Sequence, residues 1–249
     1  MLLFGNFSLN LFIAVMLVLF IGMALHEYAH CIVANWWGDP TPAEHGRLTL
    51  NPLVHIYWPG WIMFALIGFG ILGSAPINPR RMRDPRWGSF WATLAGPLSN
   101  LLLALVSGIL LRLLFDPMRA AALFGVPDAV GSLPDFLMLL LFVSVFYNAL
   151  LFVFNLLPLF PIDGWHIALA LLPGYWLSPT QIPEFIRSGM PPLARFLERP
   201  AYKWQQWAQI SQYVLLGLIL LSFVVPGTSP LGTIIIQPTF ALVRLFTGL

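Results

Sequence analysis

The stretch LNLFIAVMLVLFIGMALHEYAHCIVANWW, residues 9–37, decides how this chain must fold. Residues 9–25 are apolar apart from one asparagine, and they lead directly into His26, Glu27 and His30 rather than into the small-residue cleavage site of a secretory signal. Crossing the hydrocarbon core of a bilayer takes about 20 predominantly apolar residues. We therefore interpret residues 9–36 as a retained transmembrane helix that carries ionisable side chains near its end.

The composition of the whole chain extends this interpretation. Of its 249 residues, 59% are hydrophobic and only 9% are charged, whereas a soluble domain carries about a quarter charged residues. A surface so poor in charge must be covered largely by lipid. The sequence predicts an all-α polytopic membrane protein with about five to six transmembrane segments, which we assign among the apolar stretches 9–36, 58–73, 90–115, 136–159, 207–225 and 231–246.

Two segments that follow the first helix are not expected to be ordinary transmembrane helices. Residues 38–52 have turn residues at both ends and an alternating stretch from Arg47 to Leu50, which predicts a short β-strand or hairpin. Residues 58–73 are short, begin beside a Pro-Gly pair and contain three further glycines. We expect this second segment either to dip into the membrane and return or to pack at the interface, with protein screening its backbone.

We expect a single membrane-embedded domain over residues 1–249. Its core covers about residues 9–172, and an interfacial segment with further helices occupies residues 173–249. Within that C-terminal part, residues 178–203 are polar and rich in proline, which indicates a connection that lies at the membrane interface.

The sequence HEYAH at residues 26–30 has the H-E-x-x-H pattern on an apolar helix. Four residues make just over one helical turn, so His26 and His30 project from one face and can bind one zinc ion. Glu27 then lies beside the metal, where it can take a proton from a metal-bound water. Chance placement of these polar residues is disfavoured, because ionisable groups inside a membrane helix are costly and mostly functional.

Catalytic zinc usually has three protein ligands and a water, so one ligand remains to be found. Asp163 is the strongest candidate, because it lies in the apolar run FVFNLLPLFPIDGWHI beside residues that break a helix; the other interpretation is a turn aspartate. His166 is a rival ligand, although a supporting role is favoured. His45 and His55 lie among turn residues and are not expected to bind this metal. Cys31 is the only cysteine, which excludes a four-cysteine site.

Two asparagines in apolar segments deserve separate interpretations. Asn155 lies eight residues before Asp163, close to two helical turns, and so faces the same way unless the intervening prolines turn it aside. Its amide could donate to a developing oxyanion or form an interhelical hydrogen bond, and the residue pattern alone favours neither. Asn100 is interpreted as a packing residue that lets helices pair.

Together these segments resemble the site-2 protease family of intramembrane zinc metalloproteases. The resemblance covers about residues 25–166 and is carried by HEYAH (26–30), AGPLSN (95–100) and NLLPLFPIDG (155–164). Two further segments, GRLTLNPLVHI (46–56) and PINPRRMRDPRWG (76–88), resemble the compact bacterial and archaeal branch of this family, which lacks PDZ and CBS domains.

The resemblance implies roles for individual residues. By that similarity His26, His30 and Asp163 would be the zinc ligands, Glu27 would be the general base, and Asn155 would assist substrate or transition-state binding.

The sequence departs from the family pattern in two places. Tyr57 and Trp58 stand where an aspartate and a proline usually follow His-Ile, and Trp165 replaces a frequent second glycine. Neither departure touches the implied ligands, but both could reshape the substrate groove.

A shared metal constrains the topology. HEYAH lies near the end of its helix and Asp163 closes the fourth apolar stretch, so the two helices must run in the same direction and one intervening segment, 58–73, must not cross. Arginines at 80, 81, 83 and 86 mark one cytoplasmic loop, and basic residues at 187, 195, 199 and 203 mark another. This arrangement predicts an N-terminus outside a prokaryotic cell (inner) membrane and a zinc site nearer its cytoplasmic side.

The expected reaction is hydrolysis of a peptide bond in a membrane protein. The expected partners are a transmembrane protein substrate and the lipid bilayer, with no nucleic acid and with the oligomeric state left open. A substrate could add as a strand to residues 47–50. The alternatives are a non-proteolytic membrane scaffold and a metal transporter with a retained zinc site; the intact Glu27 argues against both, since neither needs a base.

Overall fold

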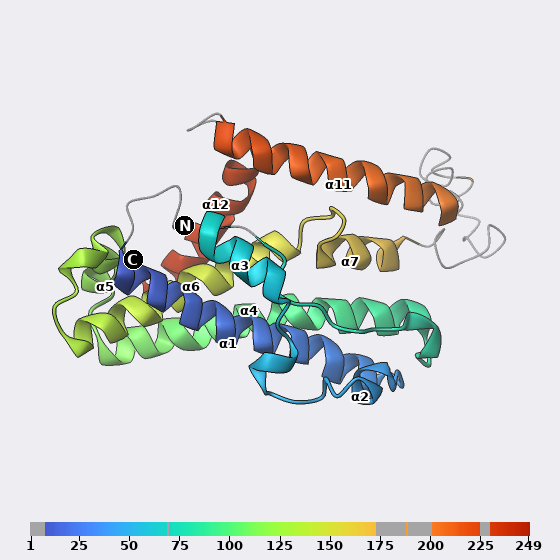
Figure 1. Ribbon diagram of the computed structural model, residues 1–249, viewed down its shortest axis with the longest axis horizontal. Coiled ribbons are helices and arrows are strands. Elements are labelled where there is room, and N and C mark those ends of the chain that lie inside the picture. Colours follow the sequence, from blue (N-terminus) through green and yellow to red (C-terminus); the bar gives the residue numbers. More distant parts are fainter. Residues whose placement is uncertain (1–7, 69, 173–187, 189–200, 225–229) are drawn as a thin grey trace.

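The computed structural model describes residues 8–68, 70–172, 188, 201–224 and 230–249. Along these ranges the chain is mainly helical (Figure 1), with elements in the order α1 (Leu9–Trp36), α2 (Thr41–Glu44), η1 (Pro52–Val54), α3 (Trp58–Ile67), η2 (Pro79–Arg81), α4 (Pro85–Leu114), α5 (Pro117–Gly125), η3 (Pro127–Ala129), α6 (Leu133–Asn155), α7 (Asp163–Leu171), α11 (Ala201–Val224) and α12 (Pro230–Thr247). The all-α prediction is confirmed at this level.

Three helices of the described part are long and apolar enough to cross a membrane, namely α1, α4 and α6. The helix α3 and the apolar part of α12 are shorter than a crossing requires. The predicted count of five to six spans is therefore not confirmed. The predicted interfacial connection at 178–203 falls almost wholly outside the described residues.

Local signals begin the second and third of these helices. Asp84 caps α4 by accepting hydrogen bonds from the backbone of Arg86 and Trp87, and Ser132 caps α6 by accepting one from the backbone of Asp135. In both helices a proline occupies the first turn, where its missing N–H is not needed.

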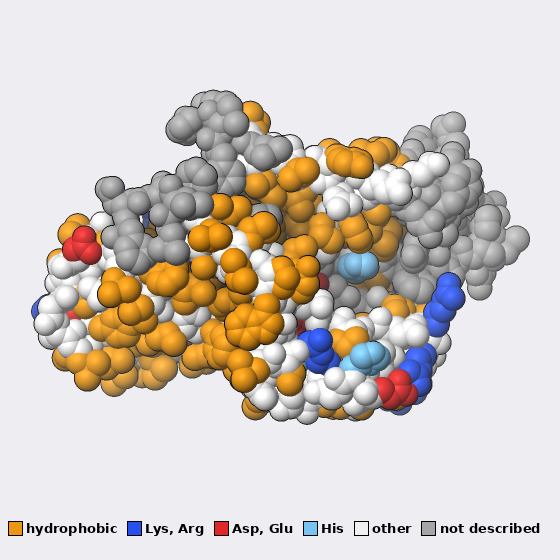
Figure 2. Space-filling model, in the orientation of Figure 1, with side chains coloured by type: hydrophobic (Ala, Val, Ile, Leu, Met, Phe, Trp, Pro, Cys, Tyr) orange, Lys and Arg blue, Asp and Glu red, His pale blue; other side chains and the backbone are white. Residues whose placement is uncertain are grey.

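The helices α1, α4 and α6 pack against one another and form the centre of the molecule. The interface between α1 and α6 contains Val15, Leu19, Leu139 and Val143, all buried. Small buried residues such as Ala104 let the backbones approach closely, which is how helices associate in lipid. Hydrophobic side chains also cover most of the outer face seen in Figure 2, as expected for a surface in contact with acyl chains.

The directions of the three helices agree with the topological prediction. In Figure 1, α1 and α6 run the same way, and α4 runs in the opposite direction. The ends of α1 and α6 that carry polar residues consequently lie at the same level.

The segment between Ile56 and Gly73 leaves the body of the protein and returns to it. These two residues form an isolated antiparallel β-bridge, and the backbone N–H of Tyr57 donates to the carbonyl of Leu72 at 3.0 Å. The indole of Trp61 donates to the same carbonyl at 2.8 Å. The intervening α3 has 10 residues, about 15 Å of helix. The two ends of the segment therefore lie side by side, and its place relative to the membrane stays a prediction.

The hairpin predicted for residues 38–52 is wrong. The structure places α2 and a series of turns there, and residues 47–50 form no strand. At the start of this segment the side chain of Asp39 holds the turn into α2: it accepts hydrogen bonds from the backbone and hydroxyl of Thr41 through Oδ1, and from the backbone of Asn78 through Oδ2. The same carboxylate thereby joins the segment after α1 to the segment before α4.

Replacing Asp39 with alanine should lower the free energy of unfolding by about 1–3 kcal/mol, because buried donors lose their acceptor. Denaturant unfolding in detergent micelles measures this change. Asp128→Ala is the matched control, since Asp128 is exposed and its replacement should change stability by less than about 0.5 kcal/mol. Equal effects of the two substitutions would contradict the assigned role of Asp39.

Candidate metal centre

Three side chains predicted as ligands come together at one point. Among the described residues, His26, His30 and Asp163 form a group whose ligand atoms lie within 4.8 Å of one another. The two Nε2 atoms are 3.0 Å apart, and Asp163 Oδ2 is 3.1 Å from that of His26 and 3.3 Å from that of His30. Ligand atoms 2.0–2.1 Å from a tetrahedral zinc would lie about 3.3 Å apart, so the spacing fits that ion.

The two histidine rings are oriented by hydrogen bonds on their far sides. His26 Nδ1 lies 2.6 Å from Oδ1 of Asn100, and His30 Nδ1 lies 2.8 Å from the carbonyl oxygen of Ala92. Both partners are acceptors, so each Nδ1 carries the hydrogen and each Nε2 presents a lone pair to the centre of the group.

The centre consequently brings together three acceptor atoms. Asp163 Oδ2 is buried and has no hydrogen-bond partner among the described residues, which agrees with unprotonated Nε2 atoms opposite it. Buried acceptors in this arrangement repel unless a cation lies between them. Two imidazoles and one carboxylate form a donor set typical of catalytic zinc, so the residues fit this metal.

Asp163 reaches the group from a different part of the fold than predicted. The preceding helix α6 ends at Asn155, and Asp163 is the first residue of α7 instead of the last residue of an apolar run. The turn between them is tight, because a Cβ on Gly164 would lie 2.2 Å from the carbonyl oxygen of Leu157. At the other end of α7, Arg86 Nε donates to the Ala170 carbonyl at 2.8 Å.

Gly96 on α4 makes room for the histidine rings. A Cβ at this position would lie 2.3 Å from Nε2 of His30 and 2.8 Å from Nε2 of His26. The next residue, Pro97, cannot donate to the carbonyl of Thr93, and this interrupts the regular hydrogen bonding in the turn where Ala92 accepts from His30. Gly96 thus provides space for the ligand pair, and Ala92, one turn earlier on α4, provides an acceptor for His30.

Glu27 lies beside this group and against the returning segment. It is buried, with 4% of its surface exposed, and a Cβ on Gly73 would lie 2.7 Å from its Oε1 atom. Only a residue without a side chain can therefore occupy position 73 while Glu27 keeps its place.

A cavity of about 720 Å³ connects these features. Its walls come from α1, residues 70–77, α4, α6, α7 and α11, and they include all three candidate ligands together with Glu27, Asn155 and His166.

The remaining predicted residues differ in their positions. Asn155 ends α6 and lines the cavity, and its Nδ2 donates one hydrogen bond to the carbonyl of Leu151 at 3.0 Å. His166 lines the cavity but lies outside the ligand group. His55 is buried and its Nε2 lies 2.9 Å from the Thr49 carbonyl, while His45 is exposed; neither belongs to the group.

The interpretation of Asn100 as a packing residue was incomplete, because its side chain also contacts His26. Its place in the AGPLSN motif was the available signal. The role of Gly73 was not predicted at all, since nothing in the local sequence shows that its backbone lies on Glu27.

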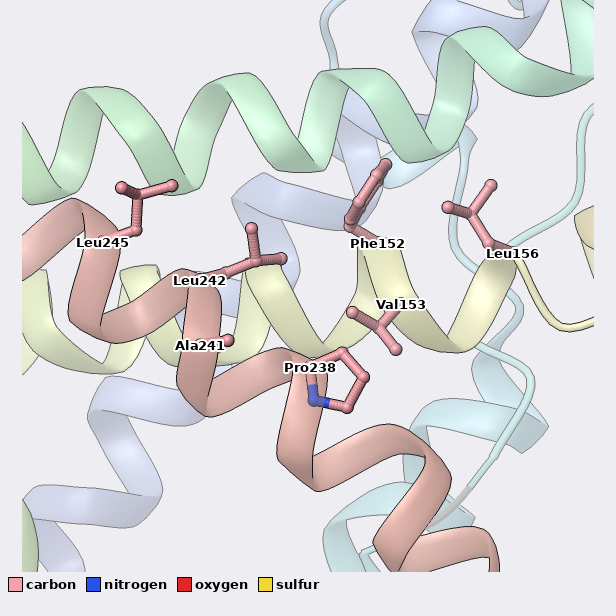
Figure 3. Close-up of a pocket in the computed structure, with 7 residues that line it drawn as sticks. All are labelled: Phe152, Val153, Leu156, Pro238, Ala241, Leu242 and Leu245. Carbon is pink, nitrogen blue, oxygen red and sulfur yellow. The ribbon is translucent and has the colours of Figure 1, made fainter.

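A second cavity of about 450 Å³ lies apart from the ligand group. Figure 3 shows that side chains of α6 and α12 face one another across it, and its lining is Phe152, Val153, Leu156, Pro238, Ala241, Leu242 and Leu245. These residues offer no metal ligand or base, so this cavity is not part of the candidate site.

Comparison with known proteins identifies the family. No family model matches the chain, and no solved structure matches it. The chain is 36% identical over 170 residues to the Bacillus subtilis protein named "Putative zinc metalloprotease YwhC", which covers 68% of this chain and 74% of that protein. The chain belongs to the site-2 protease family. Its cofactor is Zn²⁺, and His26, His30 and Asp163 form a group that could hold this ion.

A second relative supports the assignment. The chain is 32% identical over 163 residues to the Mycobacterium tuberculosis protein named "Putative zinc metalloprotease Rip2", a match that covers 63% of this chain and 56% of that protein. The chain's membership of the site-2 protease family and the three long apolar helices of its described part together identify it as an integral membrane protein.

Changing Gly96 to alanine should weaken zinc binding at least about tenfold, the scale on which disturbed ligand orientation lowers metal affinity. The new methyl group would displace both rings. Competition with a chelator measures the zinc Kd of the purified protein. Gly125→Ala is the control, because a Cβ there meets nothing within 4 Å; wild-type zinc affinity in the Gly96 variant would contradict the described ring positions.

Proposed function

We propose that this protein is an intramembrane zinc metalloprotease that hydrolyses peptide bonds within or near transmembrane segments of other membrane proteins. The observation that carries the proposal is a buried base, Glu27, in the same cavity as the two histidines and the aspartate that fit zinc. The names of its relatives support the general reaction class.

The depth of the site supports an intramembrane reaction. His26 lies 17 residues after the first residue of α1, about 26 Å along the helix. The hydrocarbon core of a bilayer is about 30 Å thick. If α1 crosses from its first residue, the site lies inside the membrane but close to one surface, where water can reach it.

The chain's own residues provide the proton transfers. When bound by this group, zinc polarises a carbonyl and makes a water more acidic. A carboxylate oxygen of Glu27 accepts the proton of the attacking water and then donates it to the leaving amine nitrogen. The free amide hydrogen of Asn155, which lines the same cavity, is suited to donate to the developing oxyanion.

The walls of the cavity indicate how a substrate would bind. Carbonyls in an intact helix are already hydrogen-bonded, so a transmembrane substrate must unwind where it is cut. Residues 70–75 and Ile77, without regular secondary structure apart from one bridge, line the cavity on one side, and α11 lines it on another. We expect the unwound substrate to lie between these two walls, in place of the strand addition at residues 47–50.

Charge supports a cytoplasmic location for this end of the molecule. Positively charged side chains gather near the start of α4 in Figure 2, where four arginines lie within residues 80–86. Short loops rich in arginine remain in the cytoplasm. We propose that the active site is nearer the cytoplasmic side of a prokaryotic inner membrane and that α1 begins outside.

Changing Glu27 to glutamine should abolish cleavage while zinc remains bound. Loss of a general base lowers rates by about 100- to 10,000-fold, whereas the ligands are untouched. Cleavage of candidate membrane substrates and the zinc content of the purified variant are measured together. His26→Ala provides the comparison, because it should lose both zinc and activity; unchanged function in the Glu27 variant would favour a scaffold or a transporter.

Cysteine labelling tests the orientation. In a Cys31→Ala background, Glu44→Cys and Arg80→Cys should react with an impermeant maleimide from the cytoplasmic side, and Asp128→Cys should react from the outside; all three residues are exposed. Labelling of Glu44→Cys and Arg80→Cys from opposite sides would show that the intervening segment crosses the membrane.

A further inference from the structure

A series of buried polar side chains lies behind His26 and connects three helices. Asn100 Nδ2 donates to Asn148 Oδ1 at 2.9 Å, and Asn148 Nδ2 donates to the backbone carbonyl of Ser144 at 2.9 Å. Neither asparagine has any exposed surface. His26 comes from α1, Asn100 from α4, and both Asn148 and Ser144 from α6. The series thus begins at a backbone carbonyl and ends at a candidate zinc ligand.

The backbone carbonyl fixes the direction of every hydrogen bond in this series. A carbonyl can only accept, so Asn148 must turn its NH₂ group toward Ser144 and its oxygen toward Asn100. Asn100 must then donate to that oxygen and present its own Oδ1 to His26. An acceptor at 2.6 Å from Nδ1 keeps the hydrogen on that atom and leaves Nε2 free to bind metal.

Gly22 shows that the position of the second asparagine is closely defined. A Cβ at residue 22 would lie 2.8 Å from Asn148 Oδ1. The Gly22 carbonyl also accepts from Asn100 Nδ2, but at 3.4 Å, near the limit for a hydrogen bond. The contact with Asn148 is therefore the main restraint on the orientation of the Asn100 amide.

We propose that Asn148 is a positioning residue for the zinc site, acting through Asn100 to hold His26 in the tautomer and orientation that bind the metal. The proposal rests on the zinc site described above and not on the cleavage reaction. This role differs from that of an ordinary polar contact between membrane helices. Such a contact would stabilise packing but would not fix which nitrogen of His26 carries the hydrogen.

The test is the zinc affinity of purified Asn148→Leu protein in detergent, measured by competition with a chelator. Leucine has a similar size but cannot accept from Asn100, whose amide can then turn its NH₂ group toward His26. Loss of a partner of this kind lowers metal affinity by about 10- to 100-fold, and we expect a loss in that range.

A rescue variant distinguishes positioning from packing. Both oxygens of a carboxylate are acceptors, so Asn100→Asp presents an acceptor to His26 in either orientation and no longer depends on Asn148. The double variant Asn100→Asp, Asn148→Leu should therefore recover most of the zinc affinity lost in the single variant. A packing defect would not be repaired in this way, because the contact between α4 and α6 is still missing.

Ser107→Ala is the matched control for a buried polar contact between the same two helices. The Ser107 hydroxyl lies 2.8 Å from that of Ser144, and its removal leaves the carbonyl that orients Asn148. Zinc affinity should stay at the wild-type value. If Asn148→Leu does not fold, Gly22→Ala, which displaces Asn148 Oδ1, should show the same loss.

The outcomes separate the two proposals. Wild-type affinity in a folded Asn148→Leu variant, absence of rescue in the double variant, or an equal loss in Ser107→Ala would each overturn the role of Asn148. A different result is that the variants show the expected zinc affinities while the wild-type protein cleaves no membrane substrate. That result would overturn the proposed protease function and leave the role of Asn148 intact.

Discussion

The structure depends on one requirement: three buried acceptor atoms from distant parts of the chain must lie close enough together to share one cation. His26 and His30 come late in α1, and Asp163 begins α7. The three ligand atoms must lie at one depth, and Asp163 follows the end of α6. The helices α1 and α6 therefore have to run in the same direction. With α4 running in the opposite direction, the segment around α3 is expected to return to the side from which it started, and the bridge between Ile56 and Gly73 places its two ends next to each other.

The parts of the site that were predictable from sequence are those that local geometry determines. The spacing of His26 and His30 is set by the helical repeat, so their shared face followed from the sequence. Asp163 was identified because a carboxylate in an apolar stretch has few other roles. Its exact placement was not predictable, because prolines at 158 and 161 end one helix without showing where the next one begins. The alternation at residues 47–50 predicted a strand, but the structure has turns and no pairing partner for these residues among the described ones.

What the sequence could not show is the rotation of each long helix about its axis. A helix with a single apolar stripe reveals which face is buried, but α4 and α6 are apolar on nearly every side. The direction in which Asn100 and Asn148 point is therefore invisible in the pattern of residues. The same is true of Gly73 and Gly96, whose importance arises from side chains that are distant in sequence. These positions become interpretable only when the backbones are placed together.

The division of the ligands between α1 and α7 also has a consequence for biosynthesis. A ribosome makes the two histidines early, but the carboxylate that completes the group is made only after α6. A nascent chain with α1 and α4 already inserted has half a binding site and no enclosed cavity. Until synthesis has passed residue 163, the growing protein has only two of the three side chains that could hold the metal. The last-made of the three therefore sets the time at which a complete zinc site can form.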